Sequence, residues 1–473
     1  MTASFTAASH AGVRRLIAPL ALAQFICSFA GSNMNVMIND ISRDLGTTVQ
    51  GVQVSITLFL LTMAALMIPA GKLTDKIGRK RCFTLGLIVY GVGALVSAVA
   101  PGLWALILGN SLLEGVGTAL LIPPVYILTT LYLSDIPTRA WAFGVISGLG
   151  GLGAAAGPLI GGLITTAISW RAAFLFQALI IVVILLLSRR LTDPVPADPR
   201  RPFDVVGAVL SALGLFAVVL GILAADNSVP LMIVLIGAGI VILVLFFWWV
   251  RRREHAGKEA LLSTALFRNR LSNVALITQN VQWIVLMGTS FTVSAYLQVV
   301  RGHSAIATGV IFTAATVGLL LTSLIAGRLA TRFSQRALIL TGFVLCVPGI
   351  VLLIWLVAGS STDWSFVPGL FLIGAGLGLM LTPSVNVVQS AFPETAQGEI
   401  SGLSRSVSNL GSTLGTAVAG TILIANVAAG SAAYGSAMTV LAVLGLGGLV
   451  AALFLPGDAS GALPREPRAA GAT

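Results

Sequence analysis

Charged residues are scarce in this sequence. Asp, Glu, Lys and Arg make up 9% of its 473 residues, while hydrophobic residues make up 57%. A soluble domain carries roughly a quarter charged residues, so this chain lacks the polar side chains needed to cover a water-facing surface. The composition therefore excludes a soluble enzyme or binding domain as the main body of the protein.

Cysteine and histidine are also few, with three of each. Cys27, Cys82 and Cys346 fall within or at the ends of apolar runs, without the spacing of a disulfide framework or a Cys/His metal site. We expect no metal or other cofactor, and no Ser, Cys or His constellation points to an enzyme. The net charge of +11 does not indicate nucleic-acid binding, because Lys and Arg occur in short clusters between apolar runs.

Long apolar runs extend almost without pause from Leu16 to Leu455. A hydrocarbon core of about 30 Å needs roughly 20 apolar residues per helix, and these runs lack the alternation of barrel strands. The predicted fold class is an all-α membrane protein with fourteen transmembrane helices. The predicted spans are 16–38, 52–71, 82–100, 103–126, 141–165, 171–188, 205–224, 230–250, 272–297, 305–326, 337–358, 366–390, 401–426 and 434–455.

The basic residues are distributed unevenly between the two sides of this map. Only Arg43, Arg171 and Arg301 fall on one side, and the other Lys and Arg residues fall on the side of the N-terminus. Short cytoplasmic loops carry the excess of positive charge in membrane proteins. We therefore expect a multi-pass protein of the bacterial inner (plasma) membrane with both termini in the cytoplasm.

Two related strings follow the second and tenth spans, Gly71-Lys-Leu-Thr-Asp-Lys-Ile-Gly-Arg-Lys80 and Gly327-Arg-Leu-Ala-Thr-Arg-Phe-Ser-Gln-Arg336. They indicate an internal duplication. In the first string Gly71 and Gly78 permit close approach, and Asp75 and Arg79 can bond neighbouring helix ends and hold a gate shut. A simple positive anchor is the alternative, and it is a stronger alternative for the second string, where Thr331 replaces the acid.

The fifth span carries a second pattern of small residues. Gly144 is followed by Gly153, then by Gly157-Pro158, and then by Gly161-Gly162. Small residues let membrane helices touch backbone to backbone, and a proline bends the helix. We interpret the pattern as a hinge, with generic close packing as the alternative.

The first string resembles the loop signature of the major facilitator superfamily, and the second pattern resembles the antiporter signature of its drug exporters. Fourteen spans resemble the fourteen-spanner drug:proton antiporter branch. The resemblance implies two six-helix halves, here 1–190 and 263–473, with two additional helices within 191–262. It also implies transport by alternating access, in which the halves rock about a site between them.

Two positions depart from the branch. Its first span usually has an acid two places before the string that matches Ser32-Asn33-Met34-Asn35, and this chain has Ala30 there. Its fourth span usually reads Arg-x-x-Gln-Gly, and this chain reads Ser111-Leu-Leu-Glu-Gly115. Residues that the family uses for proton coupling are therefore missing.

Glu114 is the one acid that the map places near the middle of a span. A charge there costs about 2.5–3.5 kcal/mol even on insertion scales, and burial without a cation favours the neutral carboxyl group. We predict that Glu114 exchanges a proton, with Asn110 on the same face as its hydrogen-bond partner. The alternative is a permanently neutral Glu114 that joins two helices. Arg405, the nearest cation, is expected in the first turn of its span, reaching toward the cytoplasm.

Other polar or aromatic residues at membrane depth predict a substrate pocket. Trp283 is the strongest of them, because an indole ring prefers the membrane interface and offers a face to cationic or aromatic ligands. Interhelical hydrogen bonding is the alternative for the amides. The predicted pocket consists of Asn33, Asn35, Asn110, Glu114, Gln279, Asn280, Gln282, Trp283 and Asn386.

The leading functional prediction is a secondary active transporter, a proton-coupled exporter of amphiphilic or cationic small molecules. Its partners would be the small-molecule substrate, protons and membrane lipid. A lipid or glycolipid translocator is the second hypothesis, and a transport-inactive membrane scaffold or sensor is the third. The oligomeric state stays open, and a monomer is compatible with the sequence.

Overall fold

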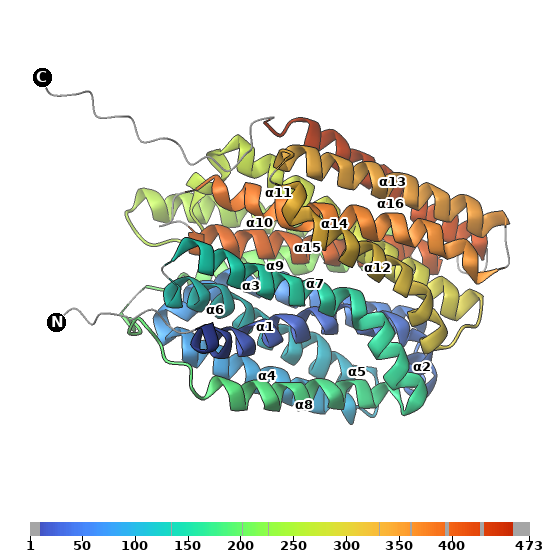
Figure 1. Ribbon diagram of the computed structural model, residues 1–473, viewed down its shortest axis with the longest axis horizontal. Helices are drawn as coiled ribbons and strands as arrows, with labels where there is room; N and C mark the ends of the chain where they lie inside the picture. The colour runs from blue at the N-terminus through green and yellow to red at the C-terminus, as the bar shows by residue number, and fades with distance from the viewer. Residues whose placement is uncertain are drawn as a thin grey trace, which may run out of the picture.

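The computed structural model describes residues 10–133, 135–200, 202–225, 227–330, 332–359, 362–392, 397–425 and 430–456. Long helices lie side by side along one direction (Figure 1). The long helices are α1 (His10–Asn33), α3 (Val49–Ile77), α4 (Arg79–Ala98), α6 (Gly115–Tyr132), α7 (Ile136–Ala167), α8 (Trp170–Ser188), α9 (Val205–Leu223), α10 (Val229–His255), α11 (Arg270–Ala295), α12 (Ala305–Leu329), α13 (Gln335–Gly359), α14 (Val367–Ser390), α15 (Gln397–Ala425) and α16 (Ser431–Leu453). The short ones are η1 (Met34–Val36), α2 (Ile38–Asp44), α5 (Leu103–Leu106), η2 (Ile107–Glu114), η3 (Thr264–Arg268), η4 (Tyr296–Val300) and η5 (Asp363–Phe366).

Within the described residues, fourteen helical segments are long and apolar enough to cross a membrane. Each overlaps one predicted span, which confirms the all-α membrane fold. The largest differences are at two ends, because the second segment continues to Ile77 and the fourth to Tyr132. The first extension, 72–77, carries Lys72, Asp75 and Lys76, so hydropathy no longer marks the helix there, whereas the second, 127–132, is mainly apolar.

Side-chain caps set the starts of several spans. The Thr48 hydroxyl accepts a hydrogen bond from the Gly51 N–H at the start of α3, and Ser304 accepts one from Ala307 N–H at the start of α12. Asp204 caps α9 in the same way. Such side chains satisfy N–H groups that the first turn of a helix leaves unpaired.

The helices form two groups that lie against each other (Figure 1). In the first group α1 packs on α7, and α4 packs on α6 and α8. In the second, α14 packs on α12 and α13, and α11 packs on α15 and α16. The groups meet where α3 packs on α15 and α7 packs on α12.

The additional helices α9 and α10 pack mainly on each other, and α9 covers the seam between α3 and α15. Val219 and Leu223 of α9 form a buried cluster there with Leu61 of α3 and Ala417 of α15. The pair therefore lies on the outside of the contact between the two halves.

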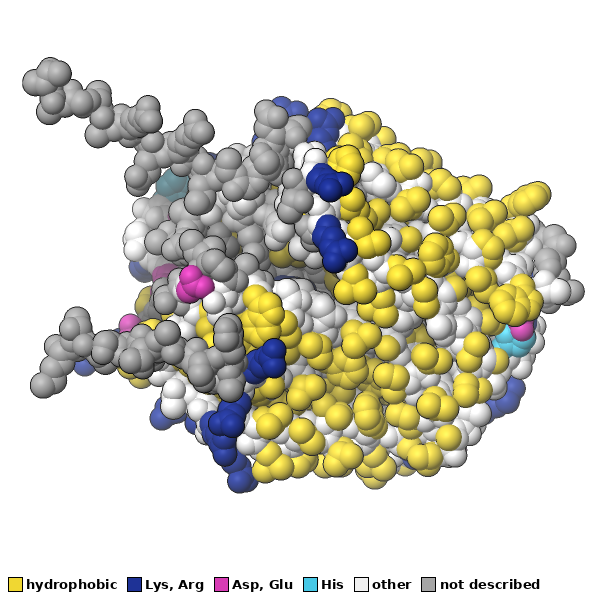
Figure 2. All heavy atoms as spheres, in the orientation of Figure 1, with side chains coloured by type: hydrophobic (Ala, Val, Ile, Leu, Met, Phe, Trp, Pro, Cys, Tyr) yellow, Lys and Arg dark blue, Asp and Glu magenta, His cyan; other side chains and the backbone are white. Residues whose placement is uncertain are grey.

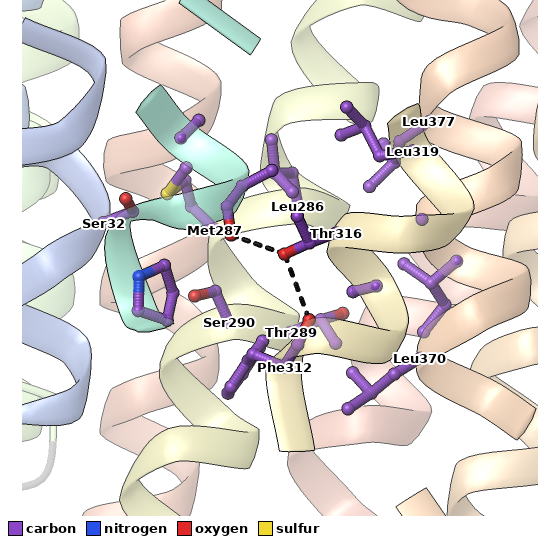
Figure 3. A pocket seen from close by; sticks show the side chains of 16 residues that line it. Ser32, Leu286, Met287, Thr289, Ser290, Phe312, Thr316, Leu319, Leu370 and Leu377 are labelled. Atoms are coloured by element: carbon purple, nitrogen blue, oxygen red, sulfur yellow. Dashed lines mark hydrogen bonds between the residues drawn. The ribbon is translucent and has the colours of Figure 1, made fainter. Parts of the chain in front are cut away.

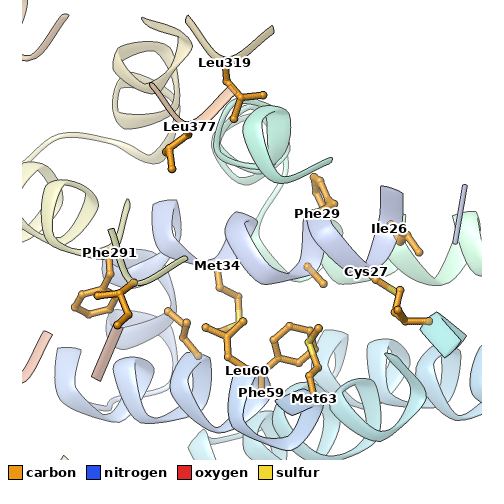
Figure 4. Close-up of a cluster of buried hydrophobic side chains, with 14 of the residues drawn as sticks. Ile26, Cys27, Phe29, Met34, Phe59, Leu60, Met63, Phe291, Leu319 and Leu377 are labelled. Carbon is orange, nitrogen blue, oxygen red and sulfur yellow. The ribbon is translucent and has the colours of Figure 1, made fainter. Parts of the chain in front are cut away.

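One large cluster of buried hydrophobic residues continues across both halves. Figure 4 shows Phe29 and Met34 from the first span close to Phe59, Leu60 and Met63 of α3, with Phe291, Leu319 and Leu377 of the second half nearby. The two halves are thus joined by close apolar packing around the region described below.

A broad apolar band covers the face seen in Figure 2, and Lys and Arg side chains gather at its left edge. We call this edge the basic end. It contains the end of α3 with Lys72 and Lys76 and the start of α4 with Lys80 and Arg81. The other edge, which contains Arg171 and Arg301, is called the opposite end.

Candidate functional site

A cavity of about 50 Å³ lies where the two halves cross. Five spans contribute to its wall (Figure 3). The residues that line it are Ser32 of α1; Ala154, Ala155 and Pro158 of α7; Leu286, Met287, Thr289 and Ser290 of α11; Phe312, Ala315, Thr316 and Leu319 of α12; and Leu370, Ile373, Gly374 and Leu377 of α14.

The wall of the cavity is apolar except for four hydroxyl groups and exposed backbone. The Thr316 hydroxyl donates to the carbonyl of Ala155 across the two halves (2.6 Å), and the Thr289 hydroxyl is buried without a partner among the described residues. The lining residues include no charged side chain. Such a site suits an apolar body with few hydrogen-bonding groups.

Toward the opposite end the cavity is closed by hydrogen bonds between the first span and the ninth. The Asn35 Nδ2 donates to Ser290 Oγ (3.0 Å), and the Gln298 Nε2 donates to the Asn35 carbonyl (2.7 Å). Next to them the Asn39 Nδ2 donates to the Gln298 carbonyl (2.6 Å). Three amide side chains thus hold the two halves together on this side.

The glycine pattern of α7 lies in this contact. A Cβ atom at Gly153 would lie 2.3 Å from the Phe25 carbonyl, and one at Gly157 would lie 2.0 Å from Ser32 Oγ. Gly161 faces Asn33. These three glycines bring α7 against α1 backbone to backbone, as the sequence predicted, while their role as a hinge stays a prediction.

The same helix touches α12 only over part of its length. Gly162 lies against Ala305, and the Pro158 carbonyl lies against Gly309. About three and four turns nearer the basic end than Pro158, Gly148 and Gly144 have no described atom within 4 Å of their Cβ positions. The two helices therefore separate toward the basic end, where Gly144 makes no close contact with a described residue.

None of the amides predicted for the pocket lines the cavity. Instead, most are hydrogen-bonded between helices. Gln279 accepts from Ser404 (2.9 Å), Gln282 accepts from Ser384 (3.0 Å), and Asn280 donates to the Val407 carbonyl (2.8 Å).

Four predicted residues make no such bond. The Asn33 and Asn110 amides are buried without a partner among the described residues. Trp283 is half-buried, with its Cβ beside Gly411, and Asn386 is exposed. Sequence analysis missed the four hydroxyl residues of the cavity, because Ser and Thr are too common in membrane helices to stand out.

Glu114 lies away from the cavity, between η2 and α4. It ends the π-helical segment η2 and is fully buried. The Ser97 hydroxyl of α4 donates to its Oε1 (3.3 Å), while Oε2 has no partner among the described residues. The Tyr90 phenol lies beside the carboxyl group and donates to Gln177 Oε1 of α8.

The bond expected between Asn110 and Glu114 is not formed. The carboxyl group points to α4, so Asn110 on the same helix is left without a described partner. Among the described residues Glu114 forms no ion pair. Its surroundings are polar but uncharged. π-Helical segments are rare in proteins, and those that occur often lie at functional sites.

The string Gly71–Lys80, which forms the end of α3 and the start of α4, is built into the first half. The Arg79 guanidinium pairs with Asp75 (2.8 Å) and donates to the Val195 carbonyl (3.2 Å). Gly78 has a φ of +97°, a value that favours glycine, and its Cβ position is 3.0 Å from Asp193. Gly71 makes an ordinary contact with Pro123, and Thr331 of the second string lies outside the described residues.

The position of Arg405 also differs from expectation. Arg405 lies two turns inside α15, and its guanidinium donates to the hydroxyl of Tyr126 on α6. It does not extend along its own helix to the end of the span, because a partner in the other half is closer.

The sequence pattern of the Major Facilitator Superfamily matches residues 20–248, 204–416 and 282–472. The chain belongs to the major facilitator superfamily. As a member of this family it is a multi-pass membrane transport protein and not an enzyme.

Relatives within the superfamily are similar over most of the chain. The puromycin resistance protein pur8 of Streptomyces alboniger is 29% identical, over 88% of this chain and 82% of that protein. The probable actinorhodin transporter of Streptomyces coelicolor is 30% identical, over 83% and 69%. The solved structure of peptide transporter POT in complex with sulfate has the same fold, with a TM-score of 0.68 and 18% identity over 94% of this chain and 95% of that one.

Proposed function

We propose that this transporter is a proton-coupled exporter of amphiphilic small molecules that works by alternating access. The observation that carries the proposal is the cavity between the halves, which is apolar, bears four hydroxyl groups and is closed toward the opposite end. In this proposal residues 1–190 and 263–473 move against each other, and the helices within 191–262 accompany them.

The names of the relatives support export. One is a puromycin resistance protein and another a probable actinorhodin transporter. Resistance follows when a compound is moved out of the cell. With the basic end in the cytoplasm, as the distribution of Lys and Arg predicts, the cavity would receive its cargo from the inside once the ion pair between Lys72 and Glu399 opens.

We assign the exchangeable proton to Glu114. It is fully buried, and the partner of its carboxyl group among the described residues is the uncharged Ser97 hydroxyl, so this group can gain and lose a proton only when its surroundings change. The Ser97 and Tyr90 hydroxyls are the groups that can stabilise the ionised form. Because Glu114 is separate from the cavity, coupling would act through movement of α4, η2 and α8.

The test compares wild type with Glu114→Gln, which keeps the shape and hydrogen bonding of the side chain but cannot exchange a proton. We expect the variant to bind cargo and to lose both uphill transport and substrate-induced proton release. The measurements are dye and antibiotic efflux from energised vesicles, with and without an uncoupler, and proton release from detergent-solubilised protein. Asp198→Asn in the exposed segment after α8 is the matched carboxyl control. Unchanged uphill transport and proton release in Glu114→Gln would refute the assignment.

A lipid translocator is the second candidate, and the separation of α7 and α12 toward the basic end favours it. An opening between two spans would admit a lipid from one leaflet. Reconstituted vesicles that contain a fluorescent lipid distinguish the two functions. Lipid movement between leaflets without efflux of soluble dyes would replace the export proposal.

A further inference from the structure

Arg405 forms an unusual contact between the two halves. Its guanidinium donates to the Tyr126 hydroxyl, and its Cζ lies 4.6 Å from the centre of the Tyr126 ring. Arg405 is on α15 of the second half and Tyr126 is on α6 of the first. The Tyr126 hydroxyl in turn donates a hydrogen bond to Gln24 Oε1 (3.3 Å).

This cation has no anionic partner in the part of the chain that the structure describes. Among the described residues Arg405 forms no ion pair, and the Tyr126 hydroxyl is its hydrogen-bond acceptor. A guanidinium has five N–H donors. None of the nitrogen atoms of Arg405 is both buried and unpaired, so each donor without a partner keeps some accessible surface.

Arg405 is also deep. It lies eight residues after Gln397, so about 12 Å inside α15. Glu399, nearer the helix start, is already paired with Lys72, and Glu114 is turned away toward α4. At this depth, the charge at the contact between the two halves is therefore the positive charge of Arg405.

The neighbours of this cation connect it to the cavity. The Tyr126 ring stacks on Phe143 of α7 (5.9 Å between centroids), beside the open positions Gly144 and Gly148. The Gln24 side chain packs on α7 at Gly150, where a Cβ atom would lie 2.9 Å from Gln24 Cγ. One turn further along α7, Ala154 lines the cavity.

We infer that Arg405 and Tyr126 bind the anionic group of an amphiphilic cargo, a carboxylate or a phosphate, whose apolar body extends along α7 into the cavity. The inference rests on the proposed function and names its substrate class. The planar fork of a guanidinium matches carboxylate and phosphate oxygens. Without cargo, the aromatic ring and hydroxyl of Tyr126 hold the cation in place.

The experiment measures binding to the full chain in a nonionic detergent, without a proton gradient. The probes share an undecyl chain with a fluorescent dansylamino group at one end. They differ in the group at the other end, which is a carboxylate, its methyl ester or a trimethylammonium group. We expect wild type to bind the carboxylate most tightly. Arg405→Met should weaken carboxylate binding about tenfold or more and ester binding less than about twofold, and Arg14→Met at the exposed start of α1 should change neither.

Two further variants keep the test decisive if Arg405→Met does not fold. Arg405→Lys retains the charge without the fork and should bind the carboxylate with intermediate affinity. Tyr126→Phe retains the ring and removes the hydroxyl, so it should weaken carboxylate binding less than Arg405→Met does. Tighter binding of the trimethylammonium probe by wild type, or equal losses for carboxylate and ester in the Arg405 variants, would overturn the inference.

The same assay separates a lipid from a soluble anion. Displacement of the carboxylate probe by phosphatidylglycerol but not by phosphatidylcholine would support the site with an anionic lipid as its ligand, and displacement by neither would support a soluble carboxylate or phosphate. A failure of proton coupling in Glu114→Gln would leave these binding differences in place, so the two proposals fail independently.

Discussion

The Lys72 ammonium group on α3 and the Glu399 carboxylate on α15 form an ion pair that joins the two halves at the basic end. Lys72 also lies 3.9 Å from Glu259 Oε1, in the segment that follows α10. One cation thus connects the first half, the second half and the chain that leaves the additional helices.

Lys72→Met should weaken this closure. A partly exposed pair contributes about 1 kcal/mol or less, so we expect a shift of up to roughly fivefold toward the form in which the halves are apart at this end. The measurement is maleimide labelling of a cysteine introduced at Ser401. Lys80→Met is the control, because Lys80 donates to the Arg189 carbonyl within one half. The charge swap Lys72→Glu with Glu399→Lys should restore only part of the protection, because a carboxylate at position 72 is repelled by Glu259. A result for Lys72→Met equal to that of the control would contradict the prediction.

Gly157→Leu should impair transport while membrane insertion is retained. The added side chain would overlap Ser32, whose Oγ is 2.0 Å from the Cβ position, and would force α7 away from α1. Gly153→Ala should act in the same direction through the Phe25 carbonyl. Gly144→Ala is the matched control, since no described atom lies within 4 Å of its Cβ position, and it should keep wild-type transport. Equal efflux rates in all three variants would show that the close approach is dispensable.

Asp75→Asn should loosen the segment after α8. Arg79 would lose its closest charged partner and remain buried, at a cost of about 1–3 kcal/mol. We expect a lower melting temperature and faster labelling of cysteines placed near Asp193. Asp198→Asn is the control, because its side chain accepts from the nearby Arg200 N–H. Thr331→Asn should change the melting temperature and the labelling less than Asp75→Asn does. Equal effects of the two substitutions would contradict the prediction that the first string contributes more than the second.

Asp40→Asn should stabilise the protein at neutral pH. Asp40 is on α2, outside the membrane-spanning segments, and burial raises the pKa of its carboxyl group above the usual 3.8, opposed by the charge of Arg43. A raised pKa means that the ionised group lowers the stability of the folded state at pH values above that pKa. The gain of the variant should therefore be largest near pH 7 and shrink as the pH falls toward 4. Melting curves of wild type and Asp40→Asn between pH 4 and pH 7 test this prediction. A stability gain of the variant that grows as the pH falls would contradict it.

The sequence by itself determined the helices and their order. A run of apolar residues of the right length can only satisfy its backbone in a membrane as a helix, so the fourteen spans followed from length and composition. The glycine spacing of α7 predicted backbone contact, because only small residues let two membrane helices approach so closely. At Gly153, Gly157 and Gly161 this contact is formed.

Only the tertiary structure decided which way each side chain faces and which helix it meets. Depth along a span follows from the sequence, but rotation about the helix axis follows from packing against neighbours that lie far away in the chain. This is why Glu114 faces Ser97 of α4 and not the cavity, and why the predicted amides bond between helices. It is also why Arg405 meets Tyr126, 279 residues away in the sequence, a pairing that no local pattern could indicate.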